Sequence, residues 1–371
     1  MKLELKNFRG IKEGAMEFGR VNVLIGGNNS GKTAVLESLF LAPNPVRRVP
    51  YGARAVEVLH QMHQTLESQG YAFLLHQYSE NASIEVSDES KRVITELSLK
   101  GEEIEVLMRD GKKVYLLGYL SKNSNSLHSA EIRIPPSLLM RKTTPPIEIK
   151  ERIIKDVVIE VDKEGGYKST GIPFDIFVSD LLGESLYFHP SLIKNAWMYF
   201  RSNWINYRAS GLTVKVAEKI SEGVGGEYDD LLLEPFFGQQ AIYIRRKDGR
   251  GVRLGDLGHG AQVFATLLLL YESVKPRILL VDDIESHMNP ALLSCVASWF
   301  MDVLENTMLF ISTHSIEAAK LIAGALEDYE PRIKLLDLSN GILKSRDFSL
   351  EELEGFEKAG IDVRLGKGVL I

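Results

Sequence analysis

Short apolar segments separated by glycine and proline mark both ends of the chain. An alternation of apolar and polar residues begins at Leu3, and residues 21–25 form a continuous apolar run; each pattern predicts a strand. The glycine-rich segment 26–33 follows directly. The spacing of apolar residues over 34–42 then predicts a helix that ends at a cluster of prolines. The opening of the chain therefore predicts a strand–loop–helix unit.

The last third of the chain repeats this order of strands and helices. The elements predicted there are strands over 278–281 and 308–311 and helices that begin near residues 261, 290 and 316. Because alternating strands and helices build open sheets covered by helices, we expect one sheet assembled from both ends of the chain, about residues 1–45 and 240–371.

The middle of the chain has a different pattern. Several short β-rich stretches lie between about residues 80 and 162, and Asp110-Gly111 between two of them is a hairpin signal. A gap that contains prolines, residues 135–146, interrupts them. A region with helical periodicity follows over about 185–235. The predicted fold class is therefore α/β with a mixed sheet, to which an antiparallel β-lobe and a helical insertion are added.

Composition and charge exclude some classes of function. The chain has 371 residues, of which 44% are hydrophobic and 25% are charged, as in ordinary globular proteins. Its net charge of −6 argues against a bulk polyanion binder, although a local basic groove stays possible. Cys295, the single cysteine, cannot form an internal disulfide, and no apolar run approaches the ~20 residues that span a bilayer. We therefore expect a cytoplasmic protein without a membrane segment.

The first candidate site is the segment GGNNSGKT. Its residues are Gly26, Gly27, Asn28, Asn29, Ser30, Gly31, Lys32 and Thr33. The segment fits the phosphate-loop pattern G-x-x-x-x-G-K-[ST], and it lies between a predicted strand and a predicted helix, as that pattern requires. Glycines let backbone amides approach phosphate oxygens, Lys32 supplies a cation to the β- and γ-phosphates, and the Thr33 hydroxyl can ligate Mg²⁺. The flanking elements disfavour the alternative, a chance glycine turn.

Two further predicted strands end in polar residues. The stretch RILLVDDIE places Asp282 and Asp283 at the C-terminal end of a buried strand, where ligands bind in open α/β sheets. One carboxylate can hold magnesium, and the second can orient or deprotonate water. The stretch MLFISTHS places His314 at the end of the next strand, within reach of a γ-phosphate or an attacking water. The alternatives are helix capping by Asp283 and an ordinary surface position for His314.

A second glycine-containing turn, LGDLGHGAQ, precedes the predicted helix of the last third. Gly258 and Gly260 lie just before the apolar stretch 263–271, so the start of this helix offers amides and a positive dipole end to an anion. A plain turn with a helix cap is the alternative, and taken alone it is the better explanation. The order of the motifs favours the anion site.

These four motifs, in this order, resemble ABC-type ATPase heads of the P-loop NTPase class. The particular resemblance is to stand-alone AAA-core ATPases related to the overcoming-lysogenization-defect nucleases and to SMC-like repair ATPases. The opening LELKNFRGIKEGAMEFGRVNVLIGGNNSGKT resembles their first β-lobe and Walker A, and LGDLGHGAQ resembles their signature motif. LLVDDIESHMNP resembles their Walker B and D-loop, and ISTHS their switch histidine. The resemblance covers the two terminal regions, and the middle third matches only in class.

The resemblance implies how such a head works. In this family the signature loop of one subunit faces the ATP held by another. A chain with one phosphate loop and one signature loop is then expected to form a head-to-tail homodimer with two Mg²⁺–ATP between the heads. Thr33 and Asp282 would hold the metal, and Gly258 and Gly260 would contact the partner's ATP. Hydrolysis removes contacts to the γ-phosphate, so ATP acts as a two-state switch.

The sequence departs from the family pattern near the strand-end acids. Asp283 stands where the family usually has glutamate, and a carboxylate misplaced by ~1 Å can cost ~10²-fold in rate. Glu285 and His287 are nearby substitutes. We therefore expect slow hydrolysis with normal ATP binding. The glutamine of the usual Q-loop has three candidates, and none is favoured: Gln61, Gln64 and Gln77.

Clusters of cations raise the possibility of a nucleic-acid partner. The cations considered for this role lie along the helical stretch from residue 193 and in the later hairpin: Lys194, Arg201, Arg208, Arg245 and Arg246. Such cations can follow a phosphate backbone. A solvated helix face and a charged hairpin that discourages edge pairing are the simpler explanation.

Three functions remain from the sequence. The first is an ATP-hydrolysing dimeric switch that acts on nucleic acid or controls an effector protein, by analogy in repair or antiviral defence. The second is a non-hydrolysing scaffold that ATP stabilises, because Asp283 is short. The third, the ATPase subunit of a membrane transporter, is disfavoured by the β-rich insertion and the opening LKNFRGI.

Overall fold

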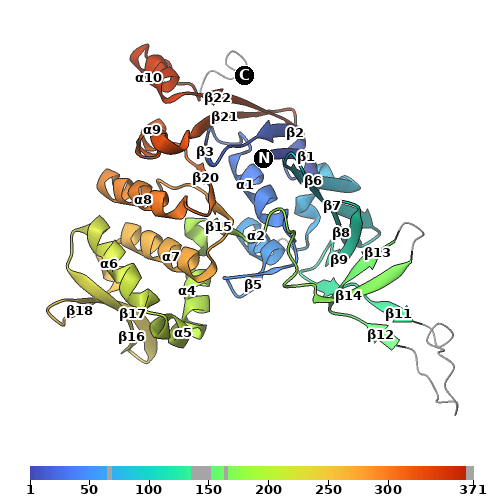
Figure 1. Cartoon of the computed structure of the whole chain (residues 1–371), viewed down its shortest axis with the longest axis horizontal. Coiled ribbons are helices and arrows are strands. Elements are labelled where there is room, and N and C mark those ends of the chain that lie inside the picture. The colour runs from blue at the N-terminus through green and yellow to red at the C-terminus, as the bar shows by residue number, and fades with distance from the viewer. Residues whose placement is uncertain (65–68, 135–151, 163–165, 365–371) are drawn as a thin grey trace.

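A large mixed sheet runs through the whole molecule. In this computed structural model, residues 1–64, 69–134, 152–162 and 166–364 are described. Within them, one sheet has the strand order β14-β13-β9-β8-β7-β6-β1-β2-β22-β21-β3-β20-β19-β15, and β10 pairs with β9. One end of this path is mainly parallel and the other is antiparallel (Figure 1). The α/β class with a mixed sheet and an antiparallel lobe is confirmed.

The parallel part is built from segments far apart in the sequence. Its strands are β3 (Val21–Ile25), β15 (Ser185–Phe188), β19 (Ile278–Val281), β20 (Met308–Ser312) and β21 (Arg332–Ser339). Strands buried on both faces read as continuous apolar runs, and β3, β15 and β19 are buried at every position. Parallel pairing of β15 with β19, of β19 with β20 and of β20 with β3 brings their carboxyl ends to one edge.

Helices cover both faces of this parallel part. Their bounds are α1 (Lys32–Leu41), α2 (Ala55–His63), α7 (His259–Val274), α8 (Pro290–Val303), α9 (Ile316–Ala325) and α10 (Leu350–Lys358). Figure 1 shows α7, α8 and α9 on one face and α1 with α2 on the other. Local chemistry fixes several helix starts: the side chain of Asn289 accepts from the amide of Leu292 in α8, and that of Ser315 accepts from the amide of Ala318 in α9.

The antiparallel part continues the same sheet. Its strands are β1 (Lys2–Phe8), β2 (Ile11–Glu17), β6 (Asn81–Ser87), β7 (Arg92–Lys100), β8 (Glu103–Asp110), β9 (Lys113–Ser121), β10 (Leu127–Ser129), β13 (Val157–Val161), β14 (Tyr167–Pro173) and β22 (Ile342–Phe348). Alternate side chains of β6, β7 and β8 are buried, as in a sheet with one solvated face. Asp110-Gly111 turns between β8 and β9, as predicted. The proline-containing gap, residues 135–146, lies outside the described residues.

The smaller sheets formed by the described residues include two with two strands each. They pair β4 (Arg48–Val49) with β5 (Ala53–Arg54), and β11 (Ile132–Ile134) with β12 (Arg152–Ile154).

The insertion before the last third differs from its sequence-based description. Its elements are α4 (Ile193–Ser202), α5 (Trp204–Ala209), α6 (Leu212–Val224), β16 (Tyr228–Phe236), β17 (Gln239–Arg246) and β18 (Gly251–Arg253). The expected helix over 193–207 is interrupted at Asn203, which leaves helical geometry (φ −112°, ψ 10°). The region expected to be helical over about 185–235 also begins with β15 and ends in β16. A four-residue strand buried on both faces carries no periodicity to detect.

Apolar residues of both parts form one continuous core, which includes α1, α7, α8 and the parallel strands. Within the part of the chain that is described, no helix combines the length and the hydrophobicity needed to cross a membrane.

Candidate functional site

The glycine-rich segment forms a tight turn between β3 and α1. Gly26 (φ +150°) and Gly31 (φ +94°) have backbone conformations that favour glycine. A Cβ on Gly26 would lie 2.6 Å from Ser30 Oγ and 2.8 Å from the carbonyl oxygen of Leu336, so no side chain fits there. The segment therefore presents the backbone at the start of α1, which is the arrangement that binds phosphate.

The Lys32 side chain is folded back over this turn. It is buried, and its Nζ donates to the carbonyl oxygens of Gly26 (2.9 Å) and Gly27 (3.2 Å). The same Nζ lies 3.4 Å from Nδ1 of His314 at the end of β20. The phosphate-loop cation and the strand-end histidine, 282 residues apart, are therefore in contact.

Asp282 follows β19 and is held by its two neighbouring strands. Its Oδ2 accepts from the Tyr187 hydroxyl of β15 (2.7 Å), and its Oδ1 accepts from Ser312 Oγ of β20. Only 1% of Asp282 is exposed, and this burial raises the pKa of its carboxyl group. The ionised form would therefore be stabilised by a nearby cation.

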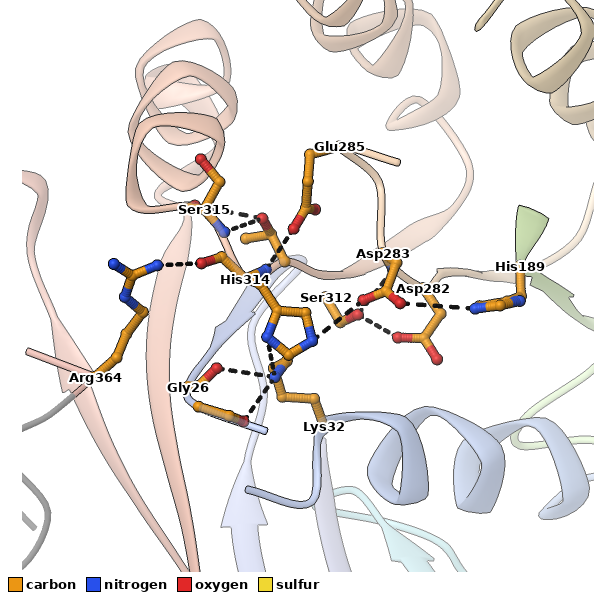
Figure 2. Close-up of polar contacts among 12 residues, drawn as sticks. Gly26, Lys32, His189, Asp282, Asp283, Glu285, Ser312, His314, Ser315 and Arg364 are labelled. Atoms are coloured by element: carbon orange, nitrogen blue, oxygen red, sulfur yellow. Dashed lines mark hydrogen bonds and ion pairs between the residues drawn. The ribbon is translucent and has the colours of Figure 1, made fainter. Parts of the chain in front are cut away.

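Asp283 lies between two histidines (Figure 2). Its amide donates to Ser312 Oγ (3.0 Å), and its backbone takes the left-handed conformation (φ +52°). One carboxylate oxygen is 3.6 Å from Nε2 of His189, and the other is 3.6 Å from Nε2 of His314. Contact with His189, followed by the charges of His314 and Lys32, lowers the pKa of Asp283, so this carboxyl group stays ionised at neutral pH.

The loop that carries His314 is held on both sides of that residue. The amide of His314 donates to Glu285 Oε1 (2.6 Å), and its carbonyl oxygen accepts from the Arg364 guanidinium (Figure 2). Arg364 is itself ion-paired to Asp362 (2.7 Å). Glu285, a candidate for water activation, thus places one carboxylate oxygen on the backbone of His314.

The second glycine turn lies at the start of α7. The backbone of Gly258 has a positive φ (+95°), a conformation that favours glycine. A Cβ on Gly260 would lie 2.7 Å from the carbonyl oxygen of His287. The rings of His259 and His287 pack edge to face, with 4.2 Å between their centroids. This turn therefore packs on the loop after β19. Within the described residues, no hydrogen bond, ion pair or ring contact joins Gly258 or Gly260 to Asp282, Asp283 or His314.

Four residues of the site were not anticipated: Tyr187, His189, Ser312 and Arg364. His189 follows β15, and the segment SLYFHP repeats the signal of the other two strand ends, an apolar run followed by a polar residue. The glutamine candidates lie elsewhere. All three are exposed, and Gln61 accepts a hydrogen bond from Asn195 of α4 (2.6 Å). The strand that pairs with β19 is followed by His189 and not by one of these glutamines.

The oxygen donors at the strand ends fit magnesium. Mg²⁺ prefers hard oxygen ligands and takes only one or two from the protein, the rest coming from phosphate and water. Thr33 at the start of α1 offers a hydroxyl, and the buried Asp282 offers a carboxyl group whose ionised form a cation would stabilise. Among the described residues, no group of three or more His, Cys, Asp or Glu side chains is arranged to hold a metal ion.

The cations considered for nucleic acid are partly neutralised. Arg208 is ion-paired to Asp230, and Arg245 to Asp229 (2.8 Å). Arg246 lies over the ring of Tyr228, with 6.0 Å to the ring centre. Lys194 and Arg201 are exposed on α4. These contacts reduce the free positive charge that this surface can offer to phosphates.

The mixed sheet, the glycine loop before α1 and the strand-end acids define a P-loop NTPase. The chain belongs to the family described as "AAA domain, putative AbiEii toxin, Type IV TA system", which matches residues 21–319. A comparison with curated proteins found no match.

Solved structures similar to this chain include heads of SMC proteins. The SMC head domain from Thermotoga maritima is 14% identical, with a TM-score of 0.46, and the alignment covers 94% of this chain and 98% of that one. A SmcHead bound to the C-winged helix domain of ScpA is also 14% identical (TM-score 0.45; 95% and 98% covered). The Smc head domain with an extended coiled coil from Pyrococcus furiosus, bound to the C-terminal domain of ScpA, is 13% identical (TM-score 0.42; 96% and 98% covered).

Proposed function

We propose that this chain binds Mg²⁺–ATP at the loop before α1 and hydrolyses it slowly. The observation that carries this proposal is a row of contacts: Lys32 Nζ lies 3.4 Å from His314, and His314 lies 3.6 Å from Asp283. A phosphate-binding cation, a strand-end histidine and an ionised carboxylate thus converge on one edge of the sheet. A phosphate-binding lysine and a residue that orients the attacking water are among the groups that phosphoryl transfer to water uses.

Each group has a role in this proposal. Backbone amides of the loop and Lys32 bind the β- and γ-phosphates, and Thr33 and Asp282 would hold the metal, which when bound neutralises phosphate charge. Asp283 orients the attacking water and accepts its proton, because it is ionised and lies at the rim of the site. His314 contacts the γ-phosphate. Glu285 and Arg364 keep the His314 loop in place.

The signature loop has its role in a second copy of the chain. Gly258 and Gly260 lie at the start of α7, and the amides and positive dipole end of this helix start are the groups that we propose for the ATP of a partner. The homodimer proposed is head-to-tail and closes over two ATP. Three statements about this chain stay predictions from the sequence. They are its membership of the overcoming-lysogenization-defect group, its cytoplasmic location, and its action on nucleic acid or on an effector protein.

A second candidate is a scaffold that binds ATP without turnover. The observation that favours it is Asp283, whose side chain is short and whose pKa is lowered, so that the carboxylate is a weak base. The two candidates differ in one measurable quantity, the turnover of ATP by the purified chain.

The experiment compares wild type with Lys32→Ala. We expect Lys32→Ala to weaken ATP binding by about 100-fold, because a buried ammonium group contributes roughly 3 kcal/mol to a charged ligand, and to remove all turnover. The matched control is Lys100→Ala, an exposed lysine at the end of β7. Unchanged affinity for a fluorescent ATP analogue in Lys32→Ala would reject the ATP site.

A further inference from the structure

His189 occupies a position in the site that the motifs did not reveal. It follows directly after β15, whose parallel pairing with β19 sets Phe188 opposite Val281. The amide of Asp282 donates to the carbonyl oxygen of Phe188 (2.8 Å). This pairing brings the ring of His189 beside the acids that follow β19.

The orientation of the His189 ring is determined by its own turn. The amide of Ser191 donates to Nδ1 of His189 (3.1 Å), and the Ser191 hydroxyl lies 2.7 Å from the same atom. An imidazole nitrogen that accepts an N–H carries no proton, so the neutral ring carries its proton on Nε2. Nε2 is the atom that faces the Asp283 carboxylate, at 3.6 Å.

The side chain of Asp283 is short, and its backbone has the left-handed conformation (φ +52°). An aspartate is one methylene shorter than a glutamate, so the strand end itself does not place its carboxylate far into the site. The two imidazoles contact opposite carboxylate oxygens, and the side chain is therefore held from two sides. Polar contacts of this kind are commonly long without ligand and shorten in the substrate complex.

We propose that His189 is a positioning residue for hydrolysis, which through Nε2–H holds the Asp283 carboxylate in the orientation that receives the proton of the attacking water. This inference rests on the proposed ATPase function. His314 contacts the phosphate-loop cation, whereas His189 is anchored to its own turn at Ser191. The ring of His189 is therefore held independently of the phosphate-loop cation.

The test is a set of substitutions at one position, with ATP turnover and ATP affinity measured for each. His189→Ala and His189→Leu remove the donor, and we expect kcat to fall about 10- to 100-fold with KM and ATP affinity nearly unchanged, the effect of a carboxylate displaced by ~1 Å. His189→Gln keeps an N–H donor at a similar reach, so it should recover most of the activity. The matched control is His128→Ala, an exposed histidine of β10 that pairs with Glu103.

Several results would overturn the inference. Turnover of His189→Ala equal to that of wild type would reject it and leave the ATPase proposal standing. Equal losses in His189→Gln and His189→Ala, with lowered thermal stability, would mean that the residue only supports the end of β15. A wild-type chain that binds ATP but does not hydrolyse it would reject both the inference and the hydrolytic part of the proposed function.

Discussion

At the scale of single residues, the proposed turnover of ATP depends on Asp283. Its carboxylate is ionised, because contact with His189 lowers its pKa, and it is only partly buried. Asp282 next to it is buried and hydrogen-bonded to two hydroxyl groups, and burial raises its pKa. Two adjacent carboxyl groups whose environments shift their pKa values in opposite directions are suited to different roles.

The role of Asp283 can be tested with an isosteric substitution. Asp283→Asn removes the charge and keeps the shape, so we expect kcat to fall by about 10²- to 10⁴-fold, the usual contribution of a general base, with ATP affinity unchanged. Asp283→Glu keeps a carboxylate and should retain measurable turnover. If wild type is inert and Asp283→Glu is active, the scaffold function is the better description.

At the scale of elements, short segments are held in place by single side chains. Arg47, which is fully buried, donates to the carbonyl oxygen and the hydroxyl of Ser185, each at 2.8 Å. The Tyr51 hydroxyl donates to the carbonyl oxygen of Tyr187 (2.5 Å). Burial lowers the pKa of Arg47 to about 10, so it stays charged at neutral pH. Among the described strands β15 pairs with β19 alone, and these contacts anchor it on its other side and thereby place His189.

The C-terminal segment holds the His314 loop in a similar way. Arg364→Ala removes the donor to the His314 carbonyl oxygen, and we expect turnover to fall about 10-fold, since a hydrogen bond from a charged group contributes roughly 1.5 kcal/mol. Arg250→Ala is the matched control, because Arg250 also pairs with an aspartate two positions earlier, Asp248. Steady-state kinetics of both variants, with melting temperatures, give the comparison; equal activities would show that Arg364 does not support the loop.

At the scale of the whole molecule, the glycine loop before α1 and the glycine turn proposed as a signature loop lie on separate elements. Gly260 packs closely on the loop after β19, so any side chain there would disturb the fold of the monomer itself. Gly255, just before this turn, has open space around it and an ordinary backbone conformation. Gly255 is therefore the better position at which to probe the contact between subunits.

We expect the chain to become a dimer only with ATP. In light scattering, Asp283→Asn with ATP should double its mass, because bound ATP would persist and join the two heads. Gly255→Glu should bind ATP and stay a monomer, since its carboxylate would face the partner's triphosphate. Gly355→Glu is the control, because Gly355 is exposed on α10 and also has open space around it. It should dimerise with ATP as the chain without this substitution does. An Asp283→Asn chain that is monomeric at saturating ATP would contradict the head-to-tail dimer.

The sequence alone determined the features that depend on local order along the chain. The glycine loop, the apolar runs of β3, β19 and β20, and the polar residues that follow them are contiguous patterns, so the P-loop class and the candidates Lys32, Asp282, Asp283 and His314 could be read directly. The hairpin at Asp110-Gly111 could also be predicted from the sequence, because the residues that favour a turn are adjacent in the chain.

Only the tertiary structure decided which strand ends meet. β15 is four residues long and buried on both faces, so no periodicity reveals it, and its pairing with β19 joins positions about 93 residues apart in the chain. That pairing places Tyr187 on Asp282 and His189 on Asp283. The physical reason is that the sequence gives the chemistry of each side chain but not the distances between side chains. At the edge of a parallel sheet these distances depend on strand order and register, and the packing of the whole core selects both.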